Sequence, residues 1–397
     1  MLAKIPFILL AGSDCITSNK FYRQVSTYIQ HCPEGAQDDY DVLLLFIKQY
    51  SFSQDTYNSY RRDVERFILW LWLIQKSTLS DASSDMISSY IQFFKSPPKS
   101  WIQAHRQSRL NADDTLNTNW RPFMASSQQV SAHTLKSMLA ILRTFFQFCL
   151  EEGVLARNPV ASLKQKRQHL SSSQENTIMR RMNAQQWQTV IGIAMRDKDS
   201  GVEAMRGLFV MSLFYLLGVR ISEISATERH TPTMGDFYQD SDLQWWFRAL
   251  GKGNKQRDIA VADELLDILS MYRHSHGLSA QPALNEGTPL VMKMKGSGGC
   301  GIRQIRNILS QRFDRAVAEM RSQGHEQLAS HLAQATAHWL RHTAISEDVA
   351  SRPLEHVRDD AGHSNIRITS HYITTDRAQR HRSAKDKKLI RSKNDVT

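Results

Sequence analysis

The chain has 397 residues, more than one hydrophobic core usually accommodates, so we expect two domains. Its 50 Lys and Arg residues against 39 Asp and Glu leave a formal net charge of +11, which favours a polyanionic partner such as nucleic acid. The four cysteines are scattered without disulfide or metal-ligand spacing, and no apolar run is long enough to cross a bilayer. These features argue against a disulfide scaffold and a membrane protein, and we expect a cytoplasmic location.

The N-terminal part of the chain is expected to form an all-α domain over residues 46–157, preceded over residues 1–45 by an extension of unassigned structure. Apolar residues recur at helical spacing in three stretches, and Ser53 can cap the first of them. These stretches cover residues 53–71, 84–94 and 131–152. Between the second and the third, residues 96–130 are polar and irregular, and we interpret them as an insertion with a short helix at best.

Residues 158–182 differ in character and are interpreted as a basic interdomain linker. Apolar residues are few, whereas cationic side chains are frequent: Lys164, Lys166, Arg167, Arg180 and Arg181. Two interpretations remain open, a solvated linker and a strap that lies along a phosphate backbone. In the second case we expect Lys164, Lys166 and Arg167 to contact DNA.

The second predicted domain covers residues 183–380 and mixes helices with a β-hairpin. Helical periodicity is found at residues 184–195, 202–217, 263–272, 302–322 and 326–335. Two apolar runs, 243–250 and 257–261, are joined by a Gly-Lys-Gly turn, which predicts an antiparallel hairpin, and a basic tail follows at 381–397. The expected fold is mainly α: an all-α bundle, then a mixed, mostly helical domain with a small hairpin or sheet.

Four short segments of the second domain carry groups suited to phosphodiester chemistry. They are Gly218-Val219-Arg220, the turn from Gly251 to Arg257 with Lys252 and Lys255, the box His338-Trp339-Leu340-Arg341-His342, and Gly362-His363 followed by His371-Tyr372. A tyrosine phenol can attack phosphorus and form a covalent ester. Two guanidinium groups can stabilise the pentavalent phosphate, a lysine can protonate the leaving 5′ oxygen, and histidines can hold or move protons. Such a set requires neither a metal nor another cofactor.

Each segment alone has a plainer interpretation. Arg220 could simply pair with Glu223, and Lys252 could be an exposed residue of a hairpin turn. His338 and His342 have the i, i+4 spacing of a zinc-binding pair, but the position of a catalytic glutamate holds tryptophan and no third ligand is evident. We therefore expect no metal site. The order of the four segments together favours one joint function.

The second domain resembles the tyrosine recombinase, or phage integrase, family. Its boxes match G-[LV]-R-x-S-E-[LI] at residues 218–224, G-K-G-x-K-x-R at 251–257, H-x-L-R-H at 338–342, and G-H with a tyrosine nine residues after the histidine. The resemblance implies the catalytic residues Arg220, Lys252, His338, Arg341 and His363, with Tyr372 as nucleophile. We also expect Lys255 and Arg257, in the hairpin turn, to bind DNA. One departure is Ala361, where the family usually has leucine.

The resemblance implies a site-specific recombinase that cleaves and rejoins duplex DNA through a 3′-phosphotyrosyl intermediate, for integration, excision or transposition of a mobile element. It also implies a homotetramer on paired sites, with monomers or dimers off DNA, in a prokaryotic cytoplasm and at the nucleoid during action. In this picture Leu389 and Ile390 of the tail dock on a neighbouring copy. Two alternatives remain: a type IB topoisomerase, which the box spacing and chain length disfavour, and a DNA-binding regulator with an inactive site.

Overall fold

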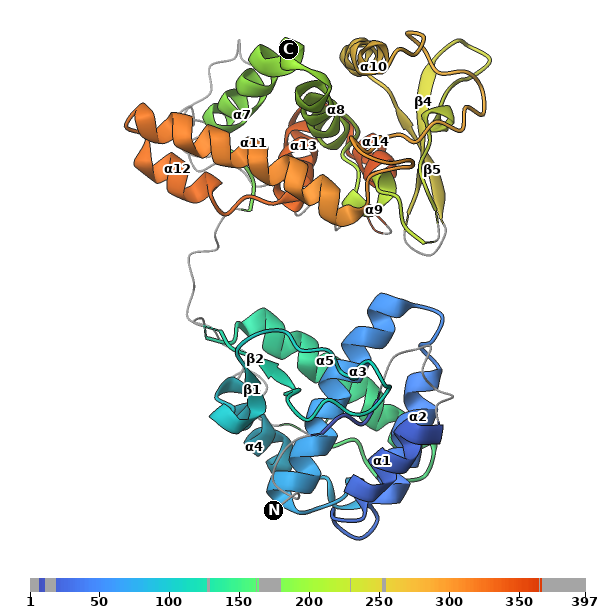
Figure 1. The fold of residues 1–397 in the computed structure, drawn as a ribbon, viewed down its shortest axis with the longest axis vertical. Coiled ribbons are helices and arrows are strands. Elements are labelled where there is room, and N and C mark those ends of the chain that lie inside the picture. Colours follow the sequence, from blue (N-terminus) through green and yellow to red (C-terminus); the bar gives the residue numbers. More distant parts are fainter. Residues whose placement is uncertain are drawn as a thin grey trace, which may run out of the picture. The chain divides into compact units, whose positions relative to one another are not determined.

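The computed structural model describes residues 7–10, 19–126, 129–161, 163, 180–228, 230–251, 255–363 and 365. The chain divides into two compact units, Met1–Asn176 and Thr177–Thr397 (Figure 1). The buried apolar residues form one large cluster between Phe7 and Leu163 and another between Met182 and Leu340. Each unit therefore has a hydrophobic core of its own.

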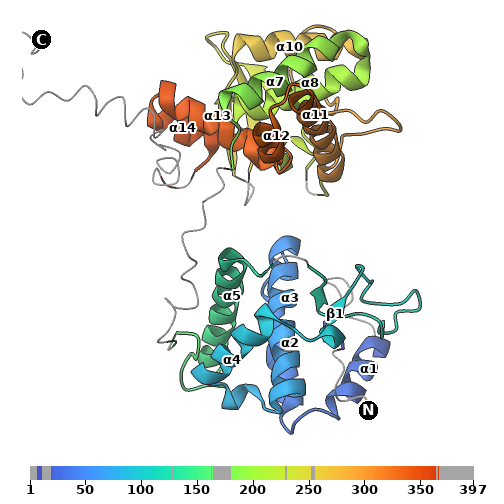
Figure 2. The same cartoon turned by 90° about the vertical axis from the view of Figure 1, so that its left-hand side faces the viewer.

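The first unit is an α-helical bundle in which α3 packs against α2 and α5 (Figure 2). Its helices are α1 (Asn19–Ile29), α2 (Ala36–Lys48), α3 (Gln54–Trp70), α4 (Ser84–Lys95) and α5 (Ala132–Glu151). The three helices predicted from periodicity correspond to α3, α4 and α5. Helices α1 and α2 occupy a stretch for which the sequence pattern predicted no defined structure. Their residues Phe21, Val25 and Leu43 are buried in the same core as the other helices.

Local capping and aromatic packing explain why these helices begin and meet where they do. The Ser83 hydroxyl accepts a hydrogen bond from the Met86 amide at 3.3 Å, and the Ser131 hydroxyl accepts one from the Thr134 amide at 3.1 Å. Such bonds satisfy amides that the first helical turn leaves without partners. In the core, the Phe67 ring of α3 meets aromatic rings of α4 and α5 at centroid distances of 5.1 and 5.3 Å.

The predicted insertion at residues 96–130 is packed onto α3 and the N-terminal segment. It contains a 3₁₀ turn, Lys99–Trp101, and two short parallel strands, β1 (Ile102–Gln103) and β2 (Phe123–Met124). Arg66 of α3 donates to the Pro122 carbonyl at 2.8 Å, and its guanidinium lies over the Phe123 ring. Arg109 binds both the buried Glu65 carboxylate and the Leu10 carbonyl. The paired strands were not predicted, because two residues are too short to show an alternating pattern.

The second unit is arranged around α8, which is apolar on all sides and packs against α7, α10, α11 and α13. Its described helices are α7 (Ala184–Asp197), α8 (Val202–Leu217), α9 (Ile221–Ile224), α10 (Asp263–Ser275), α11 (Ile302–Ser322), α12 (Glu326–Leu332), α13 (Ala337–Ser351) and α14 (Leu354–Ala361). The predicted helices of this domain are all present. The apolar surface of α8 is thus the common packing partner of the neighbouring helices.

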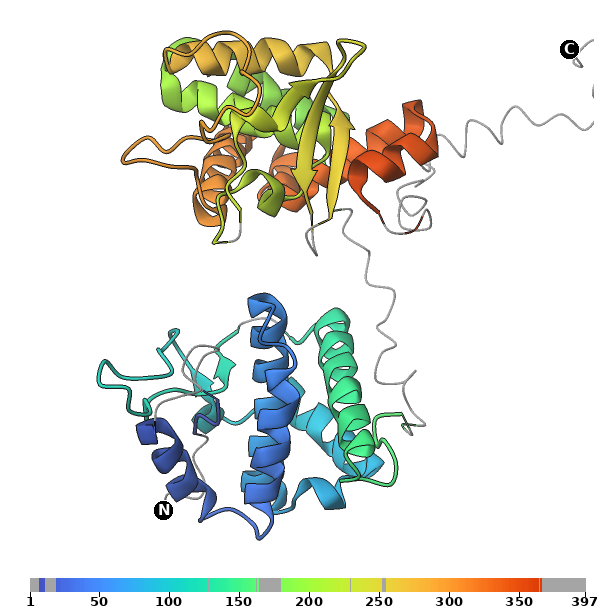
Figure 3. The same cartoon turned by 90° about the vertical axis from the view of Figure 1, so that its right-hand side faces the viewer.

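A three-stranded antiparallel sheet, ordered β3-β4-β5, lies beside this helical part (Figure 3). The strands are β3 (Phe237–Gln239), β4 (Trp245–Leu250) and β5 (Gln256–Ala260). Strands β4 and β5 form the predicted hairpin, with Phe247 paired to Ile259, and both side chains are buried. The third strand was not predicted. The end of the hairpin, Gln256–Ala260, contacts α14 and so approaches the segment that carries His363.

The structure confirms the predicted fold class, a helical bundle followed by a mostly helical unit with a small sheet. Across the residues that can be described, no helix combines the length and the apolar character needed to cross a membrane.

Candidate active site

The first arginine of the site follows a sharp helix end. Helix α8 stops at Gly218, whose φ of 58° is a left-handed conformation that glycine adopts without strain. The chain then turns into Arg220, the residue that precedes α9. The Glu223 carboxylate accepts hydrogen bonds from the Arg220 amide at 2.7 Å and from its Nη1 at 2.9 Å. The start of α9 therefore fixes the backbone and the side chain of Arg220 together.

Glu223 also holds a second arginine, which comes from strand β5. Arg257 donates from Nη1 and Nη2 to the two carboxylate oxygens at 2.7 and 2.9 Å. Burial by itself raises the pKa of Glu223, but the hydrogen bonds and charges of Arg257 and Arg220 outweigh it and hold the pKa below its usual range. The carboxylate is thus ionised at neutral pH and joins α9 to the sheet.

The turn after α14 brings the His363 segment onto these arginines. Gly362 ends the helix with a φ of 61°, and a Cβ built there would lie 3.0 Å from the Arg257 side chain. Arg257 donates from Nε to the Asp360 carbonyl at 2.7 Å, and Arg220 donates from Nη2 to the Gly362 carbonyl at 3.1 Å. The close approach and the left-handed backbone both favour glycine at position 362.

Arg341 of α13 lies at the centre of the site and is only 3% exposed. Its guanidinium donates to the carbonyls of Gly218 and Ala361, the latter at 2.6 Å, and its Nη2 lies 3.3 Å from His363 Nε2. A guanidinium can only donate, so this imidazole nitrogen is the acceptor. Burial, followed by the charges of Arg341 and Arg220, lowers the pKa of His363 to about 4. His363 is therefore a neutral imidazole at neutral pH.

The other histidines of the site share one face of α13. The Nε2 atoms of His338 and His342 are 2.8 Å apart, and the two rings meet edge to face. Burial, followed by the charges of Arg341, Arg180 and Arg220, lowers the pKa of His338. No group of three or more His, Cys, Asp or Glu side chains with metal-binding geometry occurs among the described residues.

The structure therefore joins three of the predicted catalytic residues, Arg220, Arg341 and His363, through hydrogen bonds to one another or to the turn after α14. It places His338 near enough for the charges of Arg341 and Arg220 to act on it. The remaining two, Lys252 and Tyr372, lie outside the described residues, as do Lys164, Lys166 and Arg167. Lys255 is exposed in the hairpin, and its carbonyl accepts the Gly251 amide at 2.8 Å.

Two assignments gain detail from the contacts. Arg257 was predicted to bind DNA, yet its guanidinium is engaged by Glu223 and Asp360, which favours a structural role. Glu223 was considered only as a pairing partner for Arg220, and its link to Arg257 was missed. In the sequence, Glu223 stands three positions after Arg220 at the start of a helix, which indicates a pair between these two residues. This spacing gives no sign of a second partner, Arg257, on a distant strand.

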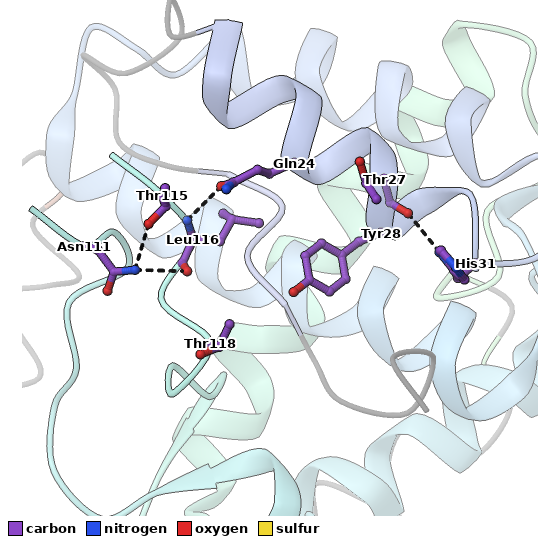
Figure 4. Close-up of a pocket in the computed structure, with 8 residues that line it drawn as sticks. All are labelled: Gln24, Thr27, Tyr28, His31, Asn111, Thr115, Leu116 and Thr118. Atoms are coloured by element: carbon purple, nitrogen blue, oxygen red, sulfur yellow. Dashed lines mark hydrogen bonds between the residues drawn. The ribbon is translucent and has the colours of Figure 1, made fainter. Parts of the chain in front are cut away.

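A cavity of about 460 Å³ lies in the first unit (Figure 4). It is lined by residues of α1, of the turn after it and of the insertion: Gln24, Thr27, Tyr28, His31, Asn111, Thr115, Leu116 and Thr118. The Leu116 amide donates to Gln24 Oε1 at 3.0 Å and ties the two walls together. The four predicted catalytic residues that the structure describes are not among the residues that line it.

Proteins similar in sequence to this chain were found by comparison with a family model and with known proteins. The family model described as the phage integrase family matches residues 180–379. Tyrosine recombinase XerC of Bacillus subtilis is 26% identical over 249 residues, which are 62% of this chain and 72% of that protein. Tyrosine recombinase XerD of Rickettsia conorii is 20% identical over 275 residues, which are 69% of this chain and 83% of that protein.

Two solved structures share the fold. The XerH site-specific recombinase, in a post-cleavage complex with palindromic difH substrate, has a TM-score of 0.56 at 15% identity, covering 95% of this chain and 91% of that one. The Tn1549 transposon integrase, in complex with circular intermediate DNA, has a TM-score of 0.52 at 15% identity, covering 87% of this chain and 99% of that one. With its family model spanning half of the sequence, the chain belongs to the phage integrase family, the tyrosine recombinases, whose members cleave and rejoin DNA strands.

Proposed function

We propose that this tyrosine recombinase acts on specific sites in duplex DNA and forms a 3′-phosphotyrosyl ester on Tyr372. The observation that carries the proposal is the buried guanidinium of Arg341, which joins the end of α8, the end of α14 and His363 in one place. Arg220 reaches the same turn through Gly362. Two guanidinium groups and a neutral histidine converging from separate segments suit a phosphate with negative charge developing on its oxygens.

In the proposed reaction, the Tyr372 phenol loses its proton to His338 while its oxygen forms a bond to phosphorus. The bond from phosphorus to the 5′ oxygen breaks, and Lys252 gives that oxygen a proton. Arg220 and Arg341 stabilise the charge on the non-bridging oxygens, and His363 binds one of them. Religation reverses the step with a 5′ hydroxyl of another strand. Because the ester retains the bond energy, no nucleotide is consumed.

The proposed substrate is double-stranded DNA. The formal charge of +11 suits a polyanion, and the structural relatives named above are described as complexes, one with difH substrate and the other with circular intermediate DNA. We assign backbone contacts to Lys164, Lys166 and Arg167 of the linker and to Lys255 of the hairpin. Substituting one of these lysines with alanine weakens binding to all sequences alike and makes the dependence on salt less steep.

For the biological outcome we propose integration, excision or transposition of a mobile element, carried out by a homotetramer on paired sites. The relative described as a transposon integrase supports the link to mobile DNA. Leu389 and Ile390 are the proposed contact with a neighbouring copy. A chain ending at Arg382 should bind a single site as the full chain does but form fewer synaptic complexes, measured by mass photometry. Equal synapsis by both chains argues against a role for the tail.

A suicide substrate with a nick beside the cleavage point tests the central step, because the cut strand diffuses away and the covalent adduct accumulates. The wild-type chain should form an adduct, and Tyr372→Phe should bind the DNA without forming one. Arg341→Ala should slow adduct formation by about 10²–10³-fold, the effect of removing one donor to a developing oxyanion. The chemistry proposed needs no metal, so the rate in chelator should equal that in buffer.

The same substrate separates the competing functions. A regulator with an inactive site binds without forming an adduct. A topoisomerase forms the adduct and relaxes supercoils but does not exchange strands between two marked duplexes. Strand exchange between such duplexes, lost in Tyr372→Phe, is the result expected of a recombinase.

A further inference from the structure

The pair formed by His338 and His342 has a geometry that bears on the proposed reaction. Both residues lie on α13, one helical turn apart, with an Nε2 to Nε2 distance of 2.8 Å and ring centroids 4.1 Å apart. The His338 side chain is partly exposed to solvent, and among the described residues His342 is the one hydrogen-bond partner that it has. Without that partner, the ring of an exposed histidine is free to rotate about both side-chain bonds.

A hydrogen bond between two imidazole nitrogens constrains their protons. One nitrogen carries the proton and the other supplies the lone pair, so a single proton lies between the two Nε2 atoms. The two rings are thereby confined to complementary tautomers. Because His338 is the proton acceptor of the proposed reaction, the matching arrangement has His342 as the donor and the His338 proton on Nδ1. The nitrogen that His338 would present to a phenol or a phosphate oxygen is thus already ordered before any DNA arrives.

Burial and the neighbouring positive charges disfavour protonation of this pair of histidines. The charged and titratable groups that face it come from four segments: Arg341 on α13, Arg180 before α7, Arg220 before α9, and His363 after α14. Burial, followed by His338, Arg341 and Arg180, lowers the pKa of His342 to about 4. At neutral pH His342 is therefore neutral and serves as a hydrogen-bond partner, without adding charge.

We propose that His342 is a positioning residue that holds the His338 imidazole in one orientation and one tautomer until a substrate oxygen replaces it as the partner of Nε2. This rests on the proposed function, in which His338 acts at the scissile phosphate. His342 makes no contact with the substrate in this scheme. Its effect on cleavage passes entirely through His338.

Single-turnover cleavage of the nicked substrate, at protein concentrations that saturate binding, tests the proposal. His342→Leu should slow cleavage about tenfold while the Kd stays unchanged, because a misoriented group loses part of its catalytic effect. His342→Gln, whose amide reaches as far as the lost ring, should recover most of the rate. His342→Asn, shorter by one carbon, should behave as the leucine variant does. His356→Leu, an exposed histidine on α14, is the matched control and should cleave as the wild type.

A double-mutant cycle separates positioning from an independent role. If His342 acts through His338, the chain with both His338→Gln and His342→Leu cleaves at the rate of His338→Gln alone. A further tenfold loss in the double variant, a wild-type rate in His342→Leu, or equal rates for the Gln and Asn variants overturns the proposal. The Gln and Asn pair decides the matter if the leucine variant does not fold.

A DNA-free measurement keeps this test distinct from that of the proposed function. In ¹⁵N spectra of the imidazole nitrogens, His338 should report one tautomer in the wild type and a solvent-averaged mixture in His342→Leu. Identical His338 resonances in the two proteins refute the positioning role, whatever the cleavage assay gives. Absence of a covalent adduct with wild-type protein refutes the proposed function and leaves the spectroscopic result standing on its own.

Discussion

Glu223 serves two arginines with one carboxylate. Its side chain is fully buried and accepts from Arg220 and, through both oxygens, from Arg257, whose side chain is 14% exposed. A buried ion pair is a weak source of stability when compared with an apolar replacement, but removing one partner leaves the other charge uncompensated. The two guanidinium groups thus depend on the carboxylate for their positions and their charge balance.

We therefore expect Glu223→Gln to destabilise the second unit by about 3 kcal/mol, the usual scale for breaking a buried pair. Urea unfolding provides the measurement. Asp258→Asn is a matched control, because Asp258 pairs with Arg248 at 3.6 Å with both side chains about 40% exposed. That substitution should cost less than about 1 kcal/mol. Equal losses in the two variants would contradict the central role of Glu223.

His363 makes the stability of the second unit depend on pH. Its pKa is lowered to about 4 from an ordinary value of 6.5, so between these values the unfolded chain binds more protons than the folded chain does. The contribution of His363 to the free energy of unfolding is complete above pH 6.5 and is lost as the pH falls toward 4. The Tm should therefore drop between pH 7 and 5, and it should drop less in His363→Gln. An unchanged pH dependence in the variant would remove His363 as its source.

Arg341 is held mainly by backbone carbonyls at the ends of two helices. Helices α8 and α14 both finish in a left-handed glycine, Gly218 and Gly362, and the carbonyls of Gly218 and Ala361 receive the guanidinium. Carbonyls near helix ends lack intrahelical partners and carry partial negative charge. Arg341 donates hydrogen bonds to these carbonyls, and the same bonds fix the position of its guanidinium.

Gly362→Ala should disturb the site through its Cβ as well as through its backbone. The new atom would lie 3.0 Å from the Arg257 side chain, on top of a backbone cost of about 1–2 kcal/mol for a left-handed alanine. Gly324→Ala, with a φ of 79° and no atom within 4 Å of the new Cβ, carries the backbone cost alone. We expect the first variant to be less stable in urea and slower in adduct formation, and the second to cleave normally. Similar behaviour of both variants would rule out the contact with Arg257.

At the scale of the whole molecule, the two separate hydrophobic cores predict two separable unfolding events. Phe209, fully buried in α8 and stacked on Tyr272, belongs to the second core, whereas Phe67 belongs to the first. Phe209→Ala should cost about 3–5 kcal/mol in the second unit only, and Phe67→Ala a similar amount in the first unit only. Hydrogen exchange measured by mass spectrometry reports each unit in the intact chain. A joint loss of protection in both units would show that they unfold as one.

Much of the fold was predictable because its signals are local. The apolar stripes of α3, α5 and α11 repeat within a few residues, and the β4–β5 hairpin is marked by its own turn. Elements with weak local signals were missed: α1 and α2 in the extension, and the short strands β1, β2 and β3. The buried Glu65, which binds the Leu9 amide at 2.8 Å and Arg109 of the insertion, also has no local signature.

By itself, the sequence determined which residue types the site has available: Arg220, His338, Arg341 and His363 stand in motifs whose order indicates phosphoryl chemistry. Tertiary structure alone decided how they meet. Arg341 reaches a carbonyl 123 positions earlier in the chain, and Glu223 pairs with an arginine 34 positions later. Such contacts arise from the packing of whole helices against a sheet, and no short-range periodicity encodes them. The hydrogen bond between His338 and His342 needed both levels, since helical spacing places the rings together and the surrounding arginines decide their charge.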